Sequence, residues 1–272
     1  MKKFVLSVSI VSIFSLLFNS LSAQVEVTDK EKNDNQVELI ASNTSFIPYT
    51  IVITCDLVNM KADTKLPYKI VLKAKETKTL FTLNTIIKNK RWQYKYNYEY
   101  YEGDLLSAKH HDHFVYNLPY QKGESHQLMQ GYNGSFSHQN RNALDFEMPE
   151  GTKITAAREG VVLQTKADSD QGCPDRKCME MANYITIYHE DGSIASYIHL
   201  KKNGVLVKPG DTVKKGQVIG LSGNTGFSTA PHLHFEVYIP TFKEGKTVKT
   251  YFITDKSSKE MLVKDNSYTS VK

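Results

Sequence analysis

Apolar and polar positions alternate along much of this chain, which is the pattern of β-strands rather than of helices. The alternation is clearest over residues 92–100, where Trp92 and four tyrosines share one face and polar or charged residues share the other. Successive side chains of a strand point to opposite faces of a sheet, so a period of two predicts strands with one buried face. The pattern therefore predicts an all-β fold.

Similar runs fill the N-terminal part of the chain, with turn-forming or charged residues between them and no helix-period stretch. Besides residues 92–100, they cover residues 36–42, 49–58, 68–74 and 78–83. Short strands at this spacing predict an immunoglobulin-like β-sandwich over residues 24–108, with a frayed polar start at residues 24–35. The aromatic stripe could bind sugar faces, but at strand spacing we interpret it as core, and this domain offers no catalytic constellation.

The C-terminal part repeats the strand pattern with glycine at the corners, and we assign residues 121–260 to a second β-rich domain. Its clearest strands are residues 143–148, 183–189, 194–200 and 232–238, with a hairpin turn at residues 190–193. Residues 165–181 are expected to form a surface loop. We place a linker at residues 109–120 and a C-terminal tail at residues 261–272.

Residues 1–23 have a basic start, a short apolar run and small residues before a predicted cut after Ala23, which describes a secretory signal peptide. The apolar run is shorter than the ~20 residues that a membrane-spanning helix needs. We therefore expect an exported protein, periplasmic or extracellular, with no stable membrane insertion once the signal peptide is removed.

Charge and cysteines add little to this picture. The balance of 34 Lys and Arg against 29 Asp and Glu gives a net charge of +5, too small and dispersed to indicate a nucleic-acid partner. Cys173 and Cys178 are close enough for a loop disulfide in an oxidising compartment, whereas a zinc knuckle would need further ligands nearby. Cys55 is expected to be a buried free thiol.

The candidate chemistry gathers around residues 220–238. Three glycines open this segment, and His232 and His234 then alternate with apolar residues, so both imidazoles share one strand face roughly 7 Å apart. The alternative interpretation is a polar strand face on which the two histidines are hydrogen-bonded and have no chemical role. Three further polar residues lie on or beside strands of the same domain: His138, Asp145 and His199.

These five side chains suit metal-assisted hydrolysis of an amide. A catalytic zinc takes three protein ligands and leaves a position for water. Two histidines and one carboxylate would fill such a site, and the metal would polarise a peptide carbonyl and lower the pKa of its water toward ~7. Two histidines would remain to take a proton from that water and to stabilise the oxyanion.

Other histidines fit this scheme less well. His110, His111 and His113 surround Asp112 in a metal-like cluster, but the cluster lies in the predicted linker, and we interpret it as a solvated patch. His126 could border the cleft. His189 ends a strand just before a turn and is expected at the surface.

Residues 114–240 resemble the lysostaphin/LytM-type zinc metallopeptidases, a family of peptidoglycan endopeptidases with a β-sheet core. The matching motifs occur in the family's order and read S-H-Q-N-R-N-A-L-D-F, E-G-T, A-A-R-E-G-V-V, S-Y-I-H-L and K-K-G-Q-V-I-G-L-S-G-N-T-G-F-S-T-A-P-H-L-H-F-E-V. The resemblance implies one zinc per chain. It also implies that His138, Asp145 and His234 are the ligands, and that His199 and His232 are the unligated catalytic histidines.

Two positions depart from the family pattern. Many relatives carry the first histidine four residues before the aspartate, where this chain has Arg141, and His138 lies seven residues before Asp145. Ala230 stands where glycine is common before the proline of the P-H-L-H segment. Extra residues between the two ligands can loop out, because only the side-chain ends must converge.

The leading hypothesis is a secreted zinc metalloendopeptidase that cuts peptide cross-links or stem peptides of peptidoglycan. One alternative is a catalytically silent module that binds wall or activates an amidase, although degenerate proteins of that kind lack one or more of the five residues. Another is an endopeptidase for non-wall proteins. The N-terminal domain is expected to be a spacer, a wall-targeting domain or a cover for the cleft.

Overall fold

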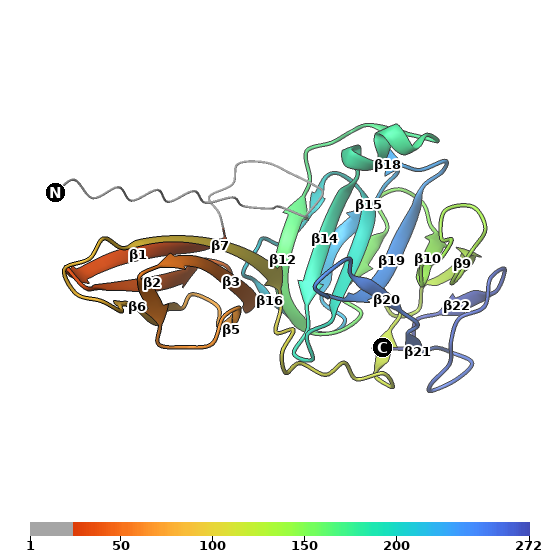
Figure 1. Cartoon of the computed structure of the whole chain (residues 1–272). Coiled ribbons are helices and arrows are strands. Elements are labelled where there is room, and N and C mark those ends of the chain that lie inside the picture. Colours follow the sequence, from red (N-terminus) through yellow and green to blue (C-terminus); the bar gives the residue numbers. More distant parts are fainter. Residues whose placement is uncertain (1–23) are drawn as a thin grey trace. The chain divides into compact units, whose positions relative to one another are not determined.

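The computed structural model describes residues 24–272, and these are almost entirely β-strands and connecting loops (Figure 1). In this part of the chain the helical segment is the short 3-10 helix η1 (Arg176–Met181). The all-β prediction is therefore confirmed. The predicted signal peptide lies outside the described residues. Within them, no helix has the length and apolar character needed to cross a membrane.

The chain divides into two compact units between Ala108 and Lys109. The first unit has two antiparallel sheets, of four and three strands. The larger has the order β1 (Val25–Asn33), β2 (Gln36–Asn43), β6 (Thr77–Thr85) and β4 (Met60–Ala62). The smaller has the order β5 (Tyr68–Leu72), β3 (Tyr49–Val58) and β7 (Gln93–Glu102).

Aromatic side chains of β7 fill the core of this unit. Tyr94, Tyr96 and Tyr98 are all buried, which confirms the interpretation of the stripe as core. The Tyr94 hydroxyl donates a hydrogen bond to Asp29, and that of Tyr96 donates to the Val27 carbonyl, so β7 of one sheet contacts β1 of the other. The immunoglobulin-like relationship of these sheets stays a prediction.

Two expectations for the first unit are wrong. The segment predicted to be frayed forms β1, which pairs with β2 and buries Val25 and Val27, because these valines alternate with polar residues and give the strand one apolar face. Cys55 is a free thiol, but it is only half-buried, because the part of β3 after Ile53 is partly exposed.

The second unit is built on a large sheet that is antiparallel throughout its main path. Its order is β16 (Thr212–Val213), β12 (Gly160–Lys166), β14 (Asn183–Tyr188), β15 (Ile194–Val205), β19 (His232–Ile239), β10 (Ala143–Glu147), β9 (Ser125–Gln130) and β22 (Ser267–Thr269). Beside this path lie β11 (Lys153–Thr155), β17 (Val218–Ser222) and β20 (Lys246–Val248). Two short parallel pairs complete the unit: β13 (Gly172–Cys173) with β18 (Gly226–Phe227), and β8 (Val115–Asn117) with β21 (Tyr251–Ile253).

Strand β19 lies in the middle of this sheet, and its two faces contact the hydrophobic core and the candidate site. Leu233, Phe235 and Val237 are fully buried in the hydrophobic core, as the alternation of the sequence predicts. Consecutive strand residues face opposite sides, so His232 and His234 lie on the other face.

The segments expected to be a linker and a tail contribute to the second unit. Tyr116 and Tyr120 belong to its hydrophobic core, and β8 pairs with β21. At the other end of the chain, β22 pairs with β9 and Tyr268 is buried. The Tyr120 hydroxyl donates a hydrogen bond of 2.7 Å to the Tyr268 carbonyl, which joins the two segments. Their aromatic residues have apolar surface to bury, which a solvated linker or tail would leave exposed.

Candidate metal centre

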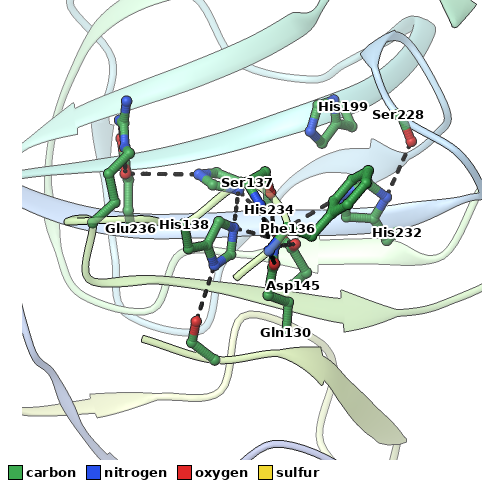
Figure 2. A network of polar contacts seen from close by, with 12 residues as sticks. Gln130, Phe136, Ser137, His138, Asp145, His199, Ser228, His232, His234 and Glu236 are labelled. Carbon is green, nitrogen blue, oxygen red and sulfur yellow. Dashed lines mark hydrogen bonds and ion pairs between the residues drawn. The ribbon is translucent and has the colours of Figure 1, made fainter. Parts of the chain in front are cut away.

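Three side chains from two strands and one loop converge on a single point, as Figure 2 shows. Asp145 of β10 lies directly opposite His234 of β19, and His138 comes from the loop before β10. Asp145 Oδ1 is 2.9 Å from His234 Nδ1, and Asp145 Oδ2 is 3.2 Å from His138 Nε2. One ligand atom from each residue lies within 4.8 Å of the others, a spacing that suits a shared metal ion.

A hydrogen bond on the far side of the His138 ring fixes its tautomer for this role. His138 Nδ1 donates to the Gly131 carbonyl at 3.1 Å, because a carbonyl oxygen can only accept. The proton on Nδ1 leaves a lone pair on Nε2, which is the nitrogen that faces Asp145 and His234. Metal-binding histidines in proteins are held in the same way.

The loop that carries His138 is folded tightly enough to absorb the long spacing to Asp145. The amide of His138 donates to the Gly134 carbonyl, and the amide of Arg141 donates to the His138 carbonyl at 2.9 Å. Asn140 has a left-handed backbone with φ +60°. The chain therefore turns back on itself before β10 begins, and the imidazole of His138 reaches the site.

Gln130, at the end of β9, connects this loop to Asp145, and no sequence pattern indicates this role. Its amide nitrogen donates to Asp145 Oδ2 at 2.8 Å and to the Ser137 hydroxyl at 2.7 Å. Its amide oxygen accepts from the backbone amides of Phe136 and Ser137. Gln130 is buried and lies opposite Asp145 in the β9–β10 pair, so only the strand register reveals it.

His199 reaches the site through a β-bulge. Ile198 pairs with Tyr184 and Leu200 pairs with Asn183, so His199 is the extra residue of β15. Its φ of +69° is unusual for a residue other than glycine. A regular strand would turn His199 to the face opposite Ile198, which lies across from His234. The bulge redirects the imidazole, and its ring centroid lies 4.5 Å from that of His232.

Backbone carbonyls also hold the two remaining histidines. His199 Nδ1 donates to the Thr225 carbonyl at 2.6 Å, and His232 Nδ1 donates to the Ala230 carbonyl at 2.8 Å. Both rings therefore keep Nε2 as a proton acceptor. His232 Nε2 lies 3.8 Å from Asp145 Oδ1, beside the three converging side chains.

In the metal-free site, the histidines differ in pKa. Burial and the neighbouring His232 lower the pKa of His199 to about 3, so this ring is neutral at physiological pH. Burial acts in the same direction on the pKa of His234, but Asp145 and Glu236 outweigh it and raise that pKa to about 9. For Asp145, the close contacts with His138 and His234 outweigh burial and hold the carboxyl pKa well below its usual range.

The loop that bears the Thr225 carbonyl is braced by the segment predicted to be a surface loop. Strand β13 of that segment pairs with β18, and Cys173 and Cys178 form a disulfide beside this pair. The two backbones approach so closely that a Cβ at Gly172 would lie 2.1 Å from the Asn224 carbonyl oxygen. The segment is thus a support for the site as well as a surface feature.

The other histidines lie elsewhere. His189 is fully buried, so its predicted surface position is wrong: the hairpin packs its ring against Tyr116, and Nδ1 donates to the Glu159 carbonyl at 2.7 Å. His126 packs edge-on against Tyr120 and hydrogen-bonds the Glu147 carbonyl. In the predicted histidine patch, His110 contacts Asp112 at 2.8 Å.

The candidate site lies in and next to the part of the chain that is similar to a known protein family. Residues 139–250 match the pattern of the family described as peptidase family M23, a range that begins one residue after His138. Peptidoglycan DD-endopeptidase ShyA of Vibrio cholerae is 42% identical over 98 residues, which are 36% of this chain and 20% of that protein. Lysostaphin of Staphylococcus staphylolyticus is 36% identical over 140 residues, which are 50% of this chain and 26% of that protein.

Among solved structures, the catalytic domain of lysostaphin from Staphylococcus simulans is 31% identical. The match covers 46% of this chain and 86% of that domain, with a TM-score of 0.34. The chain spans about a fifth to a quarter of the length of the two curated relatives named above.

Proposed function

Since this chain carries a peptidase M23 domain over residues 139–250, we propose that it is a zinc metalloendopeptidase that hydrolyses peptide bonds in peptidoglycan cross-links or stem peptides. The observation that carries the proposal is the convergence of His138, Asp145 and His234 on one point. Two further histidines with free Nε2 atoms lie beside them. The relatives named as peptidoglycan endopeptidase and lysostaphin support the substrate class.

The donor set fits zinc. Two imidazole nitrogens and one carboxylate form a typical catalytic zinc site, and the orientation of His138 presents a lone pair to the common point. Bound there, zinc would polarise the scissile carbonyl and make a water molecule acidic enough to attack it. His138, Asp145 and His234 are the proposed ligands, at one ion per chain.

His232 is the proposed general base. Its Nε2 accepts the proton of the attacking water, and Asp145 Oδ1 at 3.8 Å stabilises the resulting imidazolium. The same Nε2–H then donates the proton to the leaving amine. His199 orients the water by accepting a hydrogen bond at its own Nε2. Stabilisation of an oxyanion by His199 would require a proton on Nε2, and the hydrogen bond from Nδ1 to the Thr225 carbonyl supports the role of acceptor instead.

Export to the periplasm or outside the cell completes the proposal, because that is where peptidoglycan is accessible. It rests on the pattern of residues 1–23 and on the Cys173–Cys178 disulfide, which suits an oxidising compartment.

A digest of purified peptidoglycan tests the function. The mature protein is compared with its His232→Ala variant and with a chelator-treated sample, and the released fragments are identified by mass spectrometry. New amino and carboxyl ends that are absent from both controls are the expected result, and they name the bond. Wild-type protein that binds zinc but releases nothing from the wall, while cleaving a glycine-rich protein, would replace wall by protein as the substrate.

A further inference from the structure

A buried carboxylate follows the proposed ligand His234 on the same face of β19. Glu236 is two residues beyond His234, so the two side chains share a side of the sheet. Glu236 is only 5% exposed. Burying a charged carboxylate is costly unless it is paired, so its presence here calls for partners and for a role.

Arg141 is the first partner. Its Nε donates to Glu236 Oε2 at 3.1 Å and its terminal nitrogen donates to Oε1, which is the two-pronged geometry of a strong arginine–carboxylate pair. Arg141 lies in the loop of His138, and its own amide donates to the His138 carbonyl. The pair therefore joins the loop that carries one proposed ligand to the strand that carries another.

His234 is the second partner. Its Nδ1 faces Asp145 and His138, while its Nε2 lies 3.7 Å from Glu236 Oε2 (Figure 2). A carboxylate beside Nε2 favours a proton on that nitrogen, so in the neutral ring the lone pair is left on Nδ1. The ring of His138 is held in the opposite sense, with its proton on Nδ1 and its lone pair on Nε2.

We infer that Glu236, held in place by Arg141, is a positioning residue that fixes the ring orientation and tautomer of His234 so that Nδ1 is the metal-binding atom. This inference rests on the proposed function and deepens it. Arg141 acts on the site through Glu236. Carboxylates that hold metal-binding histidines in this way typically change metal affinity by ~10- to 100-fold when they are lost.

The test measures zinc affinity of the mature protein by chelator competition, and the absorption spectrum of the cobalt-substituted form. Glu236→Gln keeps the shape of the side chain and removes its charge. Arg141→Gln removes the paired hydrogen bonds to Glu236 by a substitution at a half-exposed position. Glu190→Gln, at an exposed position that begins the hairpin turn, is the control for the same charge change as Glu236→Gln. Thermal unfolding of the metal-free proteins verifies that each variant is folded.

We expect Glu236→Gln to bind zinc ~10- to 100-fold more weakly, with an altered cobalt spectrum, and Arg141→Gln to show a smaller loss. The double variant should lose no more than Glu236→Gln alone, since Arg141 acts through Glu236. Glu190→Gln should match the wild type.

A folded Glu236→Gln variant with wild-type zinc affinity and an unchanged cobalt spectrum would overturn the inference. Additive losses in the double variant would overturn the part assigned to Arg141. If Glu236→Gln does not fold, Arg141→Gln decides the matter, and wild-type affinity in that variant counts against the inference. A wild-type protein that binds no zinc would instead refute the proposed function, and the inference with it.

Discussion

Asp145 lies directly opposite His234 in the antiparallel pair of β10 and β19, with Oδ1 and Nδ1 2.9 Å apart. Opposite residues of such a pair share a face, so Leu144 and Phe146 are turned to the core while the aspartate is turned to the site. A slip of one residue in this register would exchange the two faces. The proposed metal centre is therefore built on a strand pair whose register is strongly specified.

Removal of the Asp145 charge should abolish metal binding. Asp145→Asn keeps the size of the side chain and leaves two neutral imidazoles, so we expect a loss of zinc affinity greater than the ~100-fold that loss of an outer partner can cause. Zinc content after gel filtration measures this, with Glu147→Gln of the same strand as the control. Retention of one zinc per chain by the folded Asp145→Asn variant would contradict the ligand assignment.

Substitution of the unligated His232 should lower turnover while leaving zinc binding intact. His232→Ala leaves His138, Asp145 and His234 in place, so we expect zinc content near that of the wild type and a fall in kcat of ~10²- to 10⁴-fold, the usual contribution of a general base. Turnover of a wall-derived peptide together with metal analysis checks both values. The assignment fails if the variant keeps full turnover.

Gln130 should matter to the site although it touches no substrate. Gln130→Leu has similar volume but leaves Asp145 Oδ2 and the amides of Phe136 and Ser137 without this partner, which should cost ~1–3 kcal/mol of stability. We also expect ~10- to 100-fold weaker zinc binding. Denaturant unfolding and chelator competition measure the two effects.

Gln127→Leu, on the same strand but exposed, provides the comparison for this change. Its stability and zinc affinity should stay close to those of the wild type. Equal effects from the two substitutions would show that the β9 position, rather than the hydrogen bonds of Gln130, is responsible.

His189 should make the protein less stable in mild acid. Burial lowers its pKa from 6.5 to about 4, so between these values the unfolded chain binds a proton that the folded chain does not. Stability contributed by this residue is thus complete above pH ~6.5 and is lost as the pH falls toward 4. The shift corresponds to a loss on the order of 3 kcal/mol.

Denaturant unfolding of metal-free protein from pH 7 to pH 4 measures this effect as the difference between wild type and His189→Asn. Asparagine retains a donor for the Glu159 carbonyl and removes the titration, so the variant should lose less stability over the interval. His113→Asn, at an exposed position, should follow the wild type. Identical slopes for all three proteins would show that burial of His189 is not linked to acid sensitivity.

The disulfide should stabilise the support of the site. Without the bond between Cys173 and Cys178, the unfolded chain gains conformational entropy worth up to ~2 kcal/mol, so the double Cys→Ser variant should unfold at a lower temperature. Calorimetry of metal-free protein measures the shift. Cys55→Ser, which alters a free thiol in the other unit, should leave the second unit's transition unchanged.

The sequence by itself determined the strand content, the core face of β19 and the set of five polar residues. Each depends on local order: a period of two assigns faces wherever apolar residues can be buried on one side. Polarity alone is a poorer guide to structure. The polar residues 24–35 suggest a frayed segment where β1 forms, and the turn after His189 suggests a surface position for a residue that is buried.

Only the tertiary structure decided which atoms meet. Strand register set Asp145 opposite His234 and Gln130 beside Asp145, since pairing between distant segments is not encoded in either segment alone. The bulge at His199 turned that ring to the site face, against its expected alternation. The clamp of Arg141 on Glu236 spans 95 residues of sequence, and its geometry exists only once β10 and β19 have paired.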